Sequence, residues 1–317
     1  MKSLLIYFMG HASSRLSMII MLPILTRVVS LEDFGIIGTF NAIYQVIGIF
    51  IGLSGTGAVV RAYMDRHDHG FNFQCYLYNA ILINTLMFSF TLIPLYLAYK
   101  FQLIKMESSF ILILPLVVLL ASLKEYKLKL WNFQEKPKRF SMFLMVFSLL
   151  SIIVSTAFLF SFFPDWRGRI YAILLVEFIF FIISVYYLIK EDGIIFKINI
   201  SYIKDILKYG LPLIPHSIGI TLLAFSDKLI LNNLSGLEDV GILSVAIGVA
   251  SMLSILFIPI DNLINPFVFK FFKNPTKFGE EIYMTSFIVY FIVISFFGFL
   301  LYLVTPIIFS FYIGESF

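Results

Sequence analysis

Long apolar stretches, separated by short polar ones, follow one another along almost the whole chain. Nine of them are long enough to cross a bilayer as helices, for which about 20 apolar residues are needed. They cover residues 4–26, 34–60, 76–98, 109–130, 140–163, 170–189, 209–231, 240–269 and 284–311. The pattern predicts an all-α polytopic membrane protein with about nine transmembrane helices.

Composition agrees with this prediction and excludes other classes. Of the 317 residues, 60% are hydrophobic and 13% are charged, and the mean hydropathy is +0.96. Soluble domains carry about 25% charged residues, so there is too little charge here to cover a soluble surface. Soluble enzymes, nucleic-acid-binding proteins and secreted disulfide-bonded domains are therefore excluded. The single cysteine, Cys75, provides neither a disulfide framework nor a cysteine metal site.

Proline interrupts several apolar stretches and predicts kinked or broken helices. It removes a backbone hydrogen bond, and inside a membrane the freed carbonyl needs a partner from a neighbouring helix or from water in a cavity. Broken helices of this kind are common in transporters. The prolines concerned are Pro23, Pro94, Pro115, Pro212, Pro215, Pro259, Pro266 and Pro306.

Lysine and arginine are distributed unequally over the two sides of the predicted membrane. Sixteen are assigned to the N-terminus and the loops after even-numbered stretches, and six to the other side. The basic stretch at 124–139 contributes most to this difference; it either fixes the topology or attracts anionic lipids and phosphates. Because positively charged loops stay in the cytoplasm, we expect the N-terminus to be cytoplasmic.

The loops on the opposite side are all short, which argues against an enzyme. Membrane enzymes that act on glycans outside the cytoplasm need a large outward loop for catalytic acids, bases or metal ligands. The sequence also contains no metal-binding histidine pair, nucleophile elbow, phosphate-binding loop or dinucleotide-binding glycine motif. We expect a secondary transporter without cofactor or metal, driven by an ion gradient, the membrane potential or the gradient of its substrate.

An internal repeat is the strongest sequence feature. ILTRVVSLEDFGI at 24–36 and ILNNLSGLEDVGI at 230–242 match at seven of thirteen positions with an offset of 206. Acidic residues before a glycine are also a common helix start, so coincidence is one interpretation. The other is two parallel halves, an N-terminal lobe of six helices at 1–206 and an incomplete lobe of three helices at 207–317. In that case the chain is a truncated form of a longer transporter.

Three stretches carry the motifs of a transporter family. Residues 22–40 contain R-x-x-x-L-x-D-F-G, residues 207–234 contain two prolines and an Asp-Lys pair, and residues 239–253 open with V-G-x-L-S-x-A. The last motif usually has Tyr where this chain has Leu243. Through these stretches the chain resembles the polysaccharide (O-antigen type) flippases of the multidrug/oligosaccharidyl-lipid/polysaccharide exporter superfamily.

The resemblance implies a two-lobed fold of six plus six helices around a central cavity, from which this chain would lack the last three helices. It implies transport of an undecaprenyl-diphosphate-linked oligosaccharide, an O-antigen or exopolysaccharide repeat unit, across the bacterial inner membrane by alternating access. The implied role lies in polysaccharide or lipopolysaccharide biosynthesis. Expected partners are the lipid-linked oligosaccharide, membrane lipids, a coupling proton or sodium ion and polysaccharide polymerase components, without nucleic acid.

Alternatives remain open at this point. They are a multidrug/cation antiporter or a peptidoglycan-precursor flippase of the same superfamily, and a non-transporting scaffold of a glycan-assembly complex. A cation-selective cavity should contain an excess of acidic residues, whereas the charges within the stretches balance, with Arg15 and Lys228 against Asp227 and Asp261. Short outward loops disfavour a membrane-embedded glycan polymerase or ligase.

Basic residues near the first two stretches are candidates for the substrate path. His11 and Arg15 lie four residues apart, on one face of the first helix. Arginine suits bidentate contact with a phosphate in the cavity; alternatively, Arg15 reaches lipid phosphates at the cytoplasmic surface. Arg61, at the end of the second stretch, either meets an incoming diphosphate or anchors the helix at the interface.

Asn41 and Gln45 have the same four-residue spacing on the second stretch, beside Gly48-x-x-x-Gly52. Small residues at this spacing are typical of close helix–helix packing, with the amides forming interhelical hydrogen bonds. The other interpretation is that Asn41 and Gln45 line the cavity and contact sugar.

Four further residues are candidates for gating or ion coupling. His216 follows two prolines. Histidine is the residue type suited to proton coupling, so His216 either couples to protons or packs as a hydrogen-bonded side chain. Asp227 and Lys228 are interpreted as an ion-pair gate or as an interfacial cap. Asp261, deep in the eighth stretch, is either a coupling-ion site or a helix cap after a kink.

Overall fold

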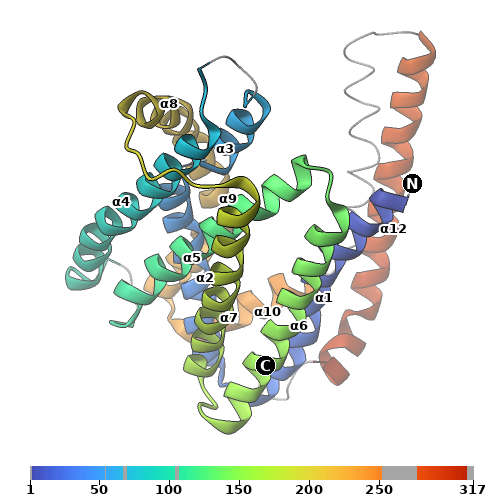
Figure 1. The fold of residues 1–317 in the computed structure, drawn as a ribbon. Coiled ribbons are helices and arrows are strands. Elements are labelled where there is room, and N and C mark those ends of the chain that lie inside the picture. Colours follow the sequence, from blue (N-terminus) through green and yellow to red (C-terminus); the bar gives the residue numbers. More distant parts are fainter. Residues whose placement is uncertain (1, 54, 67–69, 104–106, 252–276, 313–317) are drawn as a thin grey trace.

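The computed structural model describes residues 2–53, 55–66, 70–103, 107–251 and 277–312, and within these ranges every regular element is a helix (Figure 1). The all-α prediction is therefore confirmed, and the physical reason is that a helix satisfies its own backbone hydrogen bonds in lipid. The elements are α1 (Lys2–Val28), α2 (Leu31–Gly52), α3 (Gly55–Met64), α4 (Phe73–Lys100), α5 (Phe110–Phe133), α6 (Pro137–Ser161), α7 (Trp166–Tyr187), the π-helical turn η1 (Leu188–Asp192), α8 (Ile200–Gly210), the 3-10 turn η2 (Leu211–Leu213), α9 (Ile214–Leu234), α10 (Leu237–Ala250) and α12 (Lys277–Tyr312).

Five described segments are long and apolar enough to cross a membrane. They are Leu31–Gly52, Phe73–Lys100, Pro137–Ser161, Trp166–Asp192 and Ile200–Leu234. Their exposed side chains are largely apolar; on α4, for example, Leu86, Phe90 and Ile93 form an exposed stripe at helical spacing. An apolar outer surface of this kind is expected to face lipid rather than water.

Two predicted spans are broken rather than continuous. The stretch 34–60 forms two helices, because Leu53 adopts a left-handed conformation with φ 41° and ends α2. The stretch 209–231 changes direction at η2, which contains Pro212, before α9 begins. The two breaks meet, since a Cβ atom on Gly210 would overlap the carbonyl oxygen of Leu53. The stretch 240–269 begins as α10, and its remainder after residue 251 lies outside the described residues.

Polar side chains cap the helices that follow sharp turns. Ser30 accepts a hydrogen bond from the backbone N–H of Asp33 at the start of α2. Asn72 and Asp165 do the same for α4 and α7, and Asn199 caps α8. Each cap satisfies a backbone donor that has no partner within its own helix, and so fixes where that helix begins.

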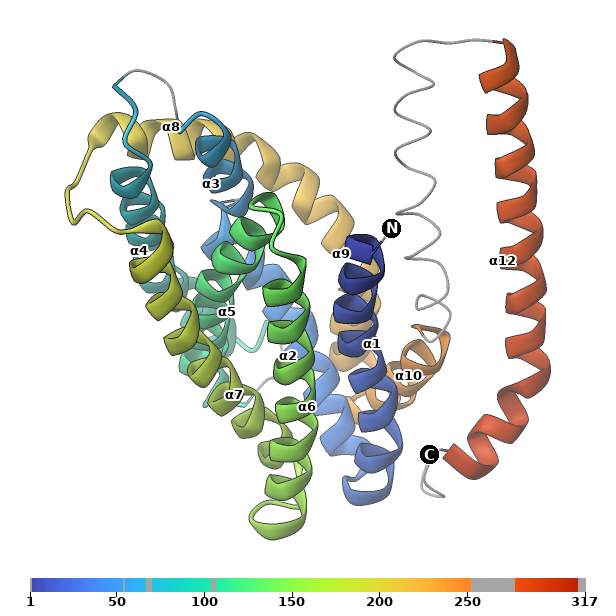
Figure 2. The ribbon, with the colours of Figure 1, turned by 45° about the vertical axis from the view of Figure 1, so that its right-hand side comes forward.

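Helix α2 lies at the centre of the described bundle. It packs against α5, α9 and α10, while α1 runs along α6 (Figure 2). The largest apolar core forms mainly between α1, α2, α5 and α7, and a second one forms between α3, α4, α5 and α8. Helix α12 lies at the edge of the bundle in the same view, and its Leu301 packs against the first core.

The two copies of the repeated stretch contact each other in a symmetric way. A Cβ atom on Gly35 would overlap the carbonyl oxygen of Leu237, and one on Gly241 would overlap that of Leu31. With the repeat offset of 206, Leu31 corresponds to Leu237 and Gly35 to Gly241. The contact of Gly35 with Leu237 is thus matched by a contact between their counterparts, Gly241 and Leu31. This reciprocity is the signature of a local two-fold axis between the first turns of α2 and α10.

Candidate functional site

A polar cavity of about 320 Å³ lies between α2, α3, α4 and α5 on one side and α9 on the other. Its lining on α2 comes from the C-terminal half of that helix, whereas the glycine contact with α10 lies at the N-terminal end of α2. The residues that line it are Gln45, Gly48, Ile49, Gly52, Thr56, Asn84, Ser122, Tyr126, Ser217 and Thr221.

Gly48 and Gly52 create much of the space in this cavity. A Cβ atom on either glycine would meet no described atom within 4 Å. Within the described residues, Gly48-x-x-x-Gly52 therefore packs against no other helix and faces the cavity. The close helix approach occurs at Gly35 and Gly241 instead, which the spacing of small residues did not indicate.

Most lining side chains are hydrogen-bonding groups without formal charge. Asn84 donates to the Ser122 hydroxyl at 3.0 Å, and Ser122 in turn donates to the carbonyl of Leu119 at 2.8 Å. The hydroxyl of Tyr126 is buried in the same lining. No carboxylate, amine, guanidinium or imidazole lines the described cavity. Such a site is suited to a neutral ligand rich in hydroxyl groups rather than to a cation.

The other candidates from the first two stretches lie outside this lining. Asn41 is exposed on α2, one turn before Gln45. His11 packs against the ring of Phe140 on α6 at 5.2 Å, and Arg15 belongs to α1, which contributes no residue to the lining. The structure thus brings Gln45 to the cavity, whereas Asn41 and His11 do not belong to its lining. The side chain of Arg15 lies outside the described part of the chain.

Arg61 lies on α3, beyond the cavity, and binds α8. Its guanidinium forms an ion pair with Asp205 and lies over the ring of Tyr209, at 5.1 Å from the centroid. Tyr76 of α4 donates to the same Asp205 carboxylate at 2.8 Å. Burial acts to lower the pKa of Arg61, but its contacts with Asp205 and Tyr76 outweigh this and raise the pKa above its usual value. Arg61 is therefore a charged anchor between α3 and α8.

The candidates on α9 are separated from one another. His216 is exposed and directly precedes Ser217, which lines the cavity. Asp227 is exposed whereas Lys228 is buried, and no ion pair joins them in the described part of the chain. Consecutive helical residues point about 100° apart, so the two side chains diverge, and their role as a gate stays a prediction. Asp261 lies outside the described residues.

Lys124 and Glu177 form a buried ion pair that the sequence did not reveal. Both residues are 6% exposed, and Lys124 Nζ lies 2.7 Å from Glu177 Oε1. The same ammonium lies 3.9 Å from the centroid of the Phe147 ring, so α5, α6 and α7 meet at this point. Glu177 Oε2 is buried and accepts no hydrogen bond from the described residues. The signal was a carboxylate inside an apolar stretch, which is rare unless it is paired.

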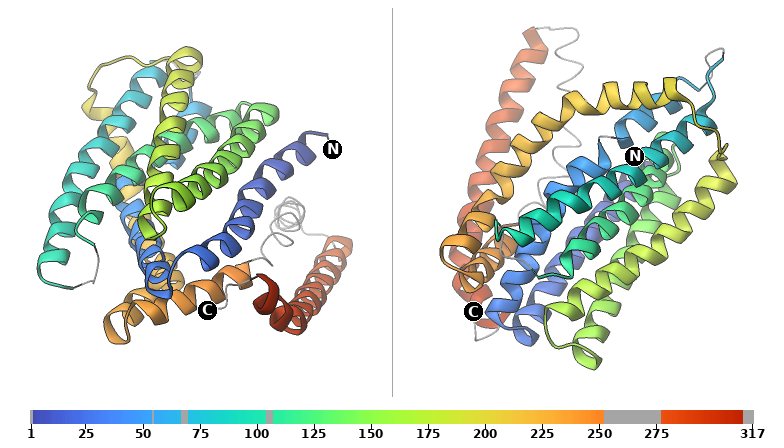
Figure 3. Two further views of the ribbon diagram at one scale, coloured as in Figure 1. Left: turned by 90° about the horizontal axis from the view of Figure 1, so that it is seen from below. Right: turned by 90° about the vertical axis from the view of Figure 1, so that its left-hand side faces the viewer.

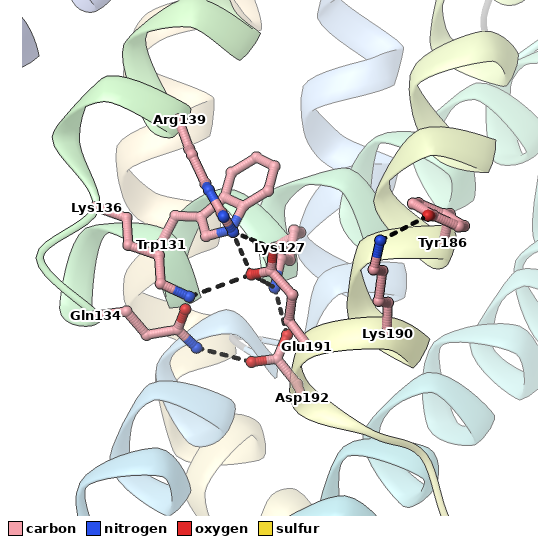
Figure 4. A network of polar contacts seen from close by, with 9 residues as sticks. All are labelled: Lys127, Trp131, Gln134, Lys136, Arg139, Tyr186, Lys190, Glu191 and Asp192. Carbon is pink, nitrogen blue, oxygen red and sulfur yellow. Dashed lines mark hydrogen bonds and ion pairs between the residues drawn. The ribbon is translucent and has the colours of Figure 1, made fainter.

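A second network joins the α5–α6 hairpin to the end of α7 (Figure 4). Lys127 is fully buried and pairs with Asp192 and, at 3.2 Å, with Glu191. Glu191 also accepts from Trp131 at 3.0 Å and pairs with Lys136 and Arg139. Lys124 and Lys127 thus lie in α5 and form ion pairs with carboxylates of α7 and η1. They were counted above among the loop charges that orient the chain in the membrane.

No group of three His, Cys, Asp or Glu side chains close enough to hold a metal ion occurs among the residues searched, which are the described ones. The side chains present at the cavity can offer hydrogen bonds only.

Solved structures show which fold this arrangement belongs to. The chain is similar to the MATE multidrug transporter DinF-BH, with a TM-score of 0.66 at 13% identity over 82% of this chain. It spans 62% of the length of that transporter. It is also similar to an inward-facing multidrug resistance MATE family transporter of the MOP superfamily, with a TM-score of 0.56 at 18% identity, covering 80% of this chain and 59% of that one. The fold is that of MATE-like membrane transporters.

Sequence comparison adds the family. No curated protein matches the chain. A family model described as "Polysaccharide biosynthesis protein" matches residues 1–272, most of its length. The chain is therefore a member of the polysaccharide biosynthesis protein family, built on a MATE-like transporter fold.

Proposed function

We propose that this chain acts in the translocation of a lipid-linked oligosaccharide across the bacterial inner membrane, as a flippase of the O-antigen or exopolysaccharide type. The observation that carries the proposal is the cavity, in which Gln45, Thr56, Ser217 and Thr221 form no hydrogen bond with other described side chains. Their free donors and acceptors suit sugar hydroxyls. Family membership and transporter fold support the same conclusion.

The cavity also favours this function over the multidrug/cation antiporter. A cation moved through a low-dielectric site needs a carboxylate close to it, because an unpaired charge there is costly. No carboxylate lines the described cavity. A peptidoglycan-precursor flippase also handles a sugar-diphosphate lipid, so it is distinguished by the choice of substrate in the experiment below.

In the proposed arrangement, the repeated stretches form the contact between the two lobes. Residues 1–206 and 207–317 form the two lobes, and the reciprocal contact of Gly35 and Gly241 closes the cavity on the outer side. With the N-terminus in the cytoplasm, the cavity is then accessible from the leaflet on which lipid-linked oligosaccharides are assembled. Coupling to a proton or sodium ion and contact with polymerase components belong to the same proposal.

The test uses a substitution that fills the cavity without disturbing the fold. Gly48→Leu places a side chain in open space, so we expect insertion and folding to persist while the sugar is excluded. Gly219→Leu is the matched control, since it also enters open space but lies outside the cavity lining. Both are expressed in a bacterium without its own flippase, with a matching lipid-linked repeat unit, in this chain and in any longer reading frame that contains it.

We expect wild type and Gly219→Leu to restore surface glycan, and Gly48→Leu to reduce it at least about tenfold, the effect of losing about 1.4 kcal/mol of binding. Normal surface glycan with a correctly inserted Gly48→Leu variant would contradict the role of the cavity. Failure of the wild type in both forms, despite insertion and a matching substrate, would refute the flippase. Activity restricted to a peptidoglycan precursor would replace the O-antigen type with that alternative.

A further inference from the structure

The segment between α7 and α9 has a surface that the transport proposal does not use. After η1 the chain reaches Asn199 without regular secondary structure and then forms α8, at the end of the bundle where α3 also lies (Figures 1 and 3). Phe196 is 78% exposed and Ile200 is 67% exposed, and Ile195, Ile198 and Leu211 are exposed as well. Large apolar side chains are thus presented to the surroundings at this end of the bundle.

The segment that carries these exposed side chains is held to α3 and α4 by hydrogen bonds and an ion pair. The carbonyl of Lys197 accepts hydrogen bonds from Asn79 Nδ2 at 2.9 Å and from Cys75 Sγ at 3.2 Å. Asn199 donates to Asn79 Oδ1 at 3.0 Å and caps α8. Asp205 holds α8 to α3 through its ion pair with Arg61. The apolar side chains are therefore held at the surface by a fixed backbone.

Three lysines share this surface without internal partners. Lys197, Lys204 and Lys208 are exposed, and their ammonium groups make no hydrogen bond or ion pair within the described chain. Lys204 and Lys208 are one turn apart on α8, away from the buried Ile206. The one carboxylate of α8, that of Asp205, is already used by Arg61. The surface is thus both apolar and positively charged.

An aromatic pair indicates the level at which this surface lies relative to the membrane. The ring of Phe196 packs edge-on against Tyr78 at 5.3 Å. Tyr78 lies in the second turn of α4, which is a candidate span, so Phe196 stands at the level where that span enters the bilayer. Aromatic side chains favour this interfacial level, and lysines next to them reach the headgroups.

We propose that residues 195–208 form a docking surface for anionic phospholipids of the leaflet at this end of the bundle. Phe196, Ile198 and Ile200 enter the boundary between headgroups and acyl chains, and Lys197, Lys204 and Lys208 contact the phosphates. Amphipathic segments with lysine on the polar side bind membranes in this way. Because Asp205 and Asn79 tie the segment to α3 and α4, bound lipid would hold the connection between the proposed lobes at a fixed depth.

The expected gain in affinity for anionic lipid follows from the number of lysines. One lysine near an anionic membrane surface strengthens binding about fivefold, so three lysines acting together strengthen it about 100-fold. The proposal does not depend on transport activity, and its test measures lipid binding alone.

The test compares lipid retention by native mass spectrometry of the purified full chain, titrated with phosphatidylglycerol or with phosphatidylcholine. Lys197→Gln/Lys204→Gln/Lys208→Gln removes the proposed charges. The matched control is Lys100→Gln/Arg167→Gln, which removes two exposed cations at the opposite end of the bundle, outside the basic stretch 124–139. All five side chains are exposed, so both variants should fold.

We expect wild type and control to bind phosphatidylglycerol in preference to phosphatidylcholine, and the first variant to lose about 100-fold in affinity for phosphatidylglycerol. Equal losses in both variants, or no preference for the anionic lipid in the wild type, would overturn the proposal. So would displacement of the lipid from this surface by a co-purified protein, because the face would then be a protein interface.

Discussion

The buried ion pair of Lys124 and Glu177 allows a quantitative prediction. Both side chains are 6% exposed, and the carboxylate has Lys124 as its one cationic partner in the described chain, at 2.7 Å. Removing one member leaves the other charged and desolvated, which costs about 3–5 kcal/mol in buried pairs. We therefore expect Glu177→Leu and Lys124→Met each to lower the free energy of unfolding by this amount.

The double variant separates charge from packing. Replacing both members by apolar residues of similar volume removes the desolvation cost together with the attraction, and is often neutral or stabilising by about 1–4 kcal/mol. We expect Lys124→Met/Glu177→Leu to be more stable than either single variant. Equilibrium unfolding in mixed micelles gives the four free energies of the cycle.

An exposed pair serves as the control. Arg167 contacts Asp165 at 3.4 Å with the arginine side chain about half exposed, and pairs of this kind contribute at most about 1 kcal/mol. Arg167→Gln should therefore change stability little. If the single core variants were also within about 1 kcal/mol of wild type, or if their costs simply added in the double variant, the ion pair would not hold α5 to α7.

Three further predictions concern stability and are measured by unfolding of the purified chain. Gly35→Ala should cost about 1–3 kcal/mol, because its Cβ overlaps the backbone of α10, whereas Gly52→Ala enters open space and should be tolerated; equal effects would contradict the proposed contact. Glu191→Gln should cost about 2 kcal/mol by weakening its charged hydrogen bonds, and a neutral result would mean that the network of Figure 4 does not fasten α7. Asn199→Ala should cost about 1 kcal/mol through loss of the α8 cap, with Asn199→Asp close to wild type; an equal loss in both would refute capping.

The sequence was informative where the physics is local. Apolar stretches of sufficient length predicted the helices, and Pro212 correctly indicated an interruption before α9. The repeat at 24–36 and 230–242 identified two segments that prove to lie in contact through Gly35 and Gly241. In each case the sequence feature lies within a few neighbouring residues or in a stretch that is repeated along the chain.

The cavity was harder to predict from the sequence, because its residues come from helices that are far apart along the chain. Gln45 could be named from α2 alone, but Asn84 and Ser122 share a cavity with it only through packing. Glu177 meets Lys124 across 53 residues of chain, and no spacing rule connects them. Gly48 and Gly52 have the spacing of a packing motif, and only the described structure shows that they line a cavity instead.

The most direct test of the account is translocation of a lipid-linked oligosaccharide in vesicles that contain the purified chain or a longer reading frame including it. The sugar carries a fluorophore, and a membrane-impermeant reductant reports how much label reaches the outer leaflet. The account predicts that nearly all label becomes accessible with the wild type and with Gly219→Leu, but only the initial outer fraction with Gly48→Leu. Wild-type vesicles that behave like protein-free ones, or that move a cationic dye and no oligosaccharide, would contradict the account.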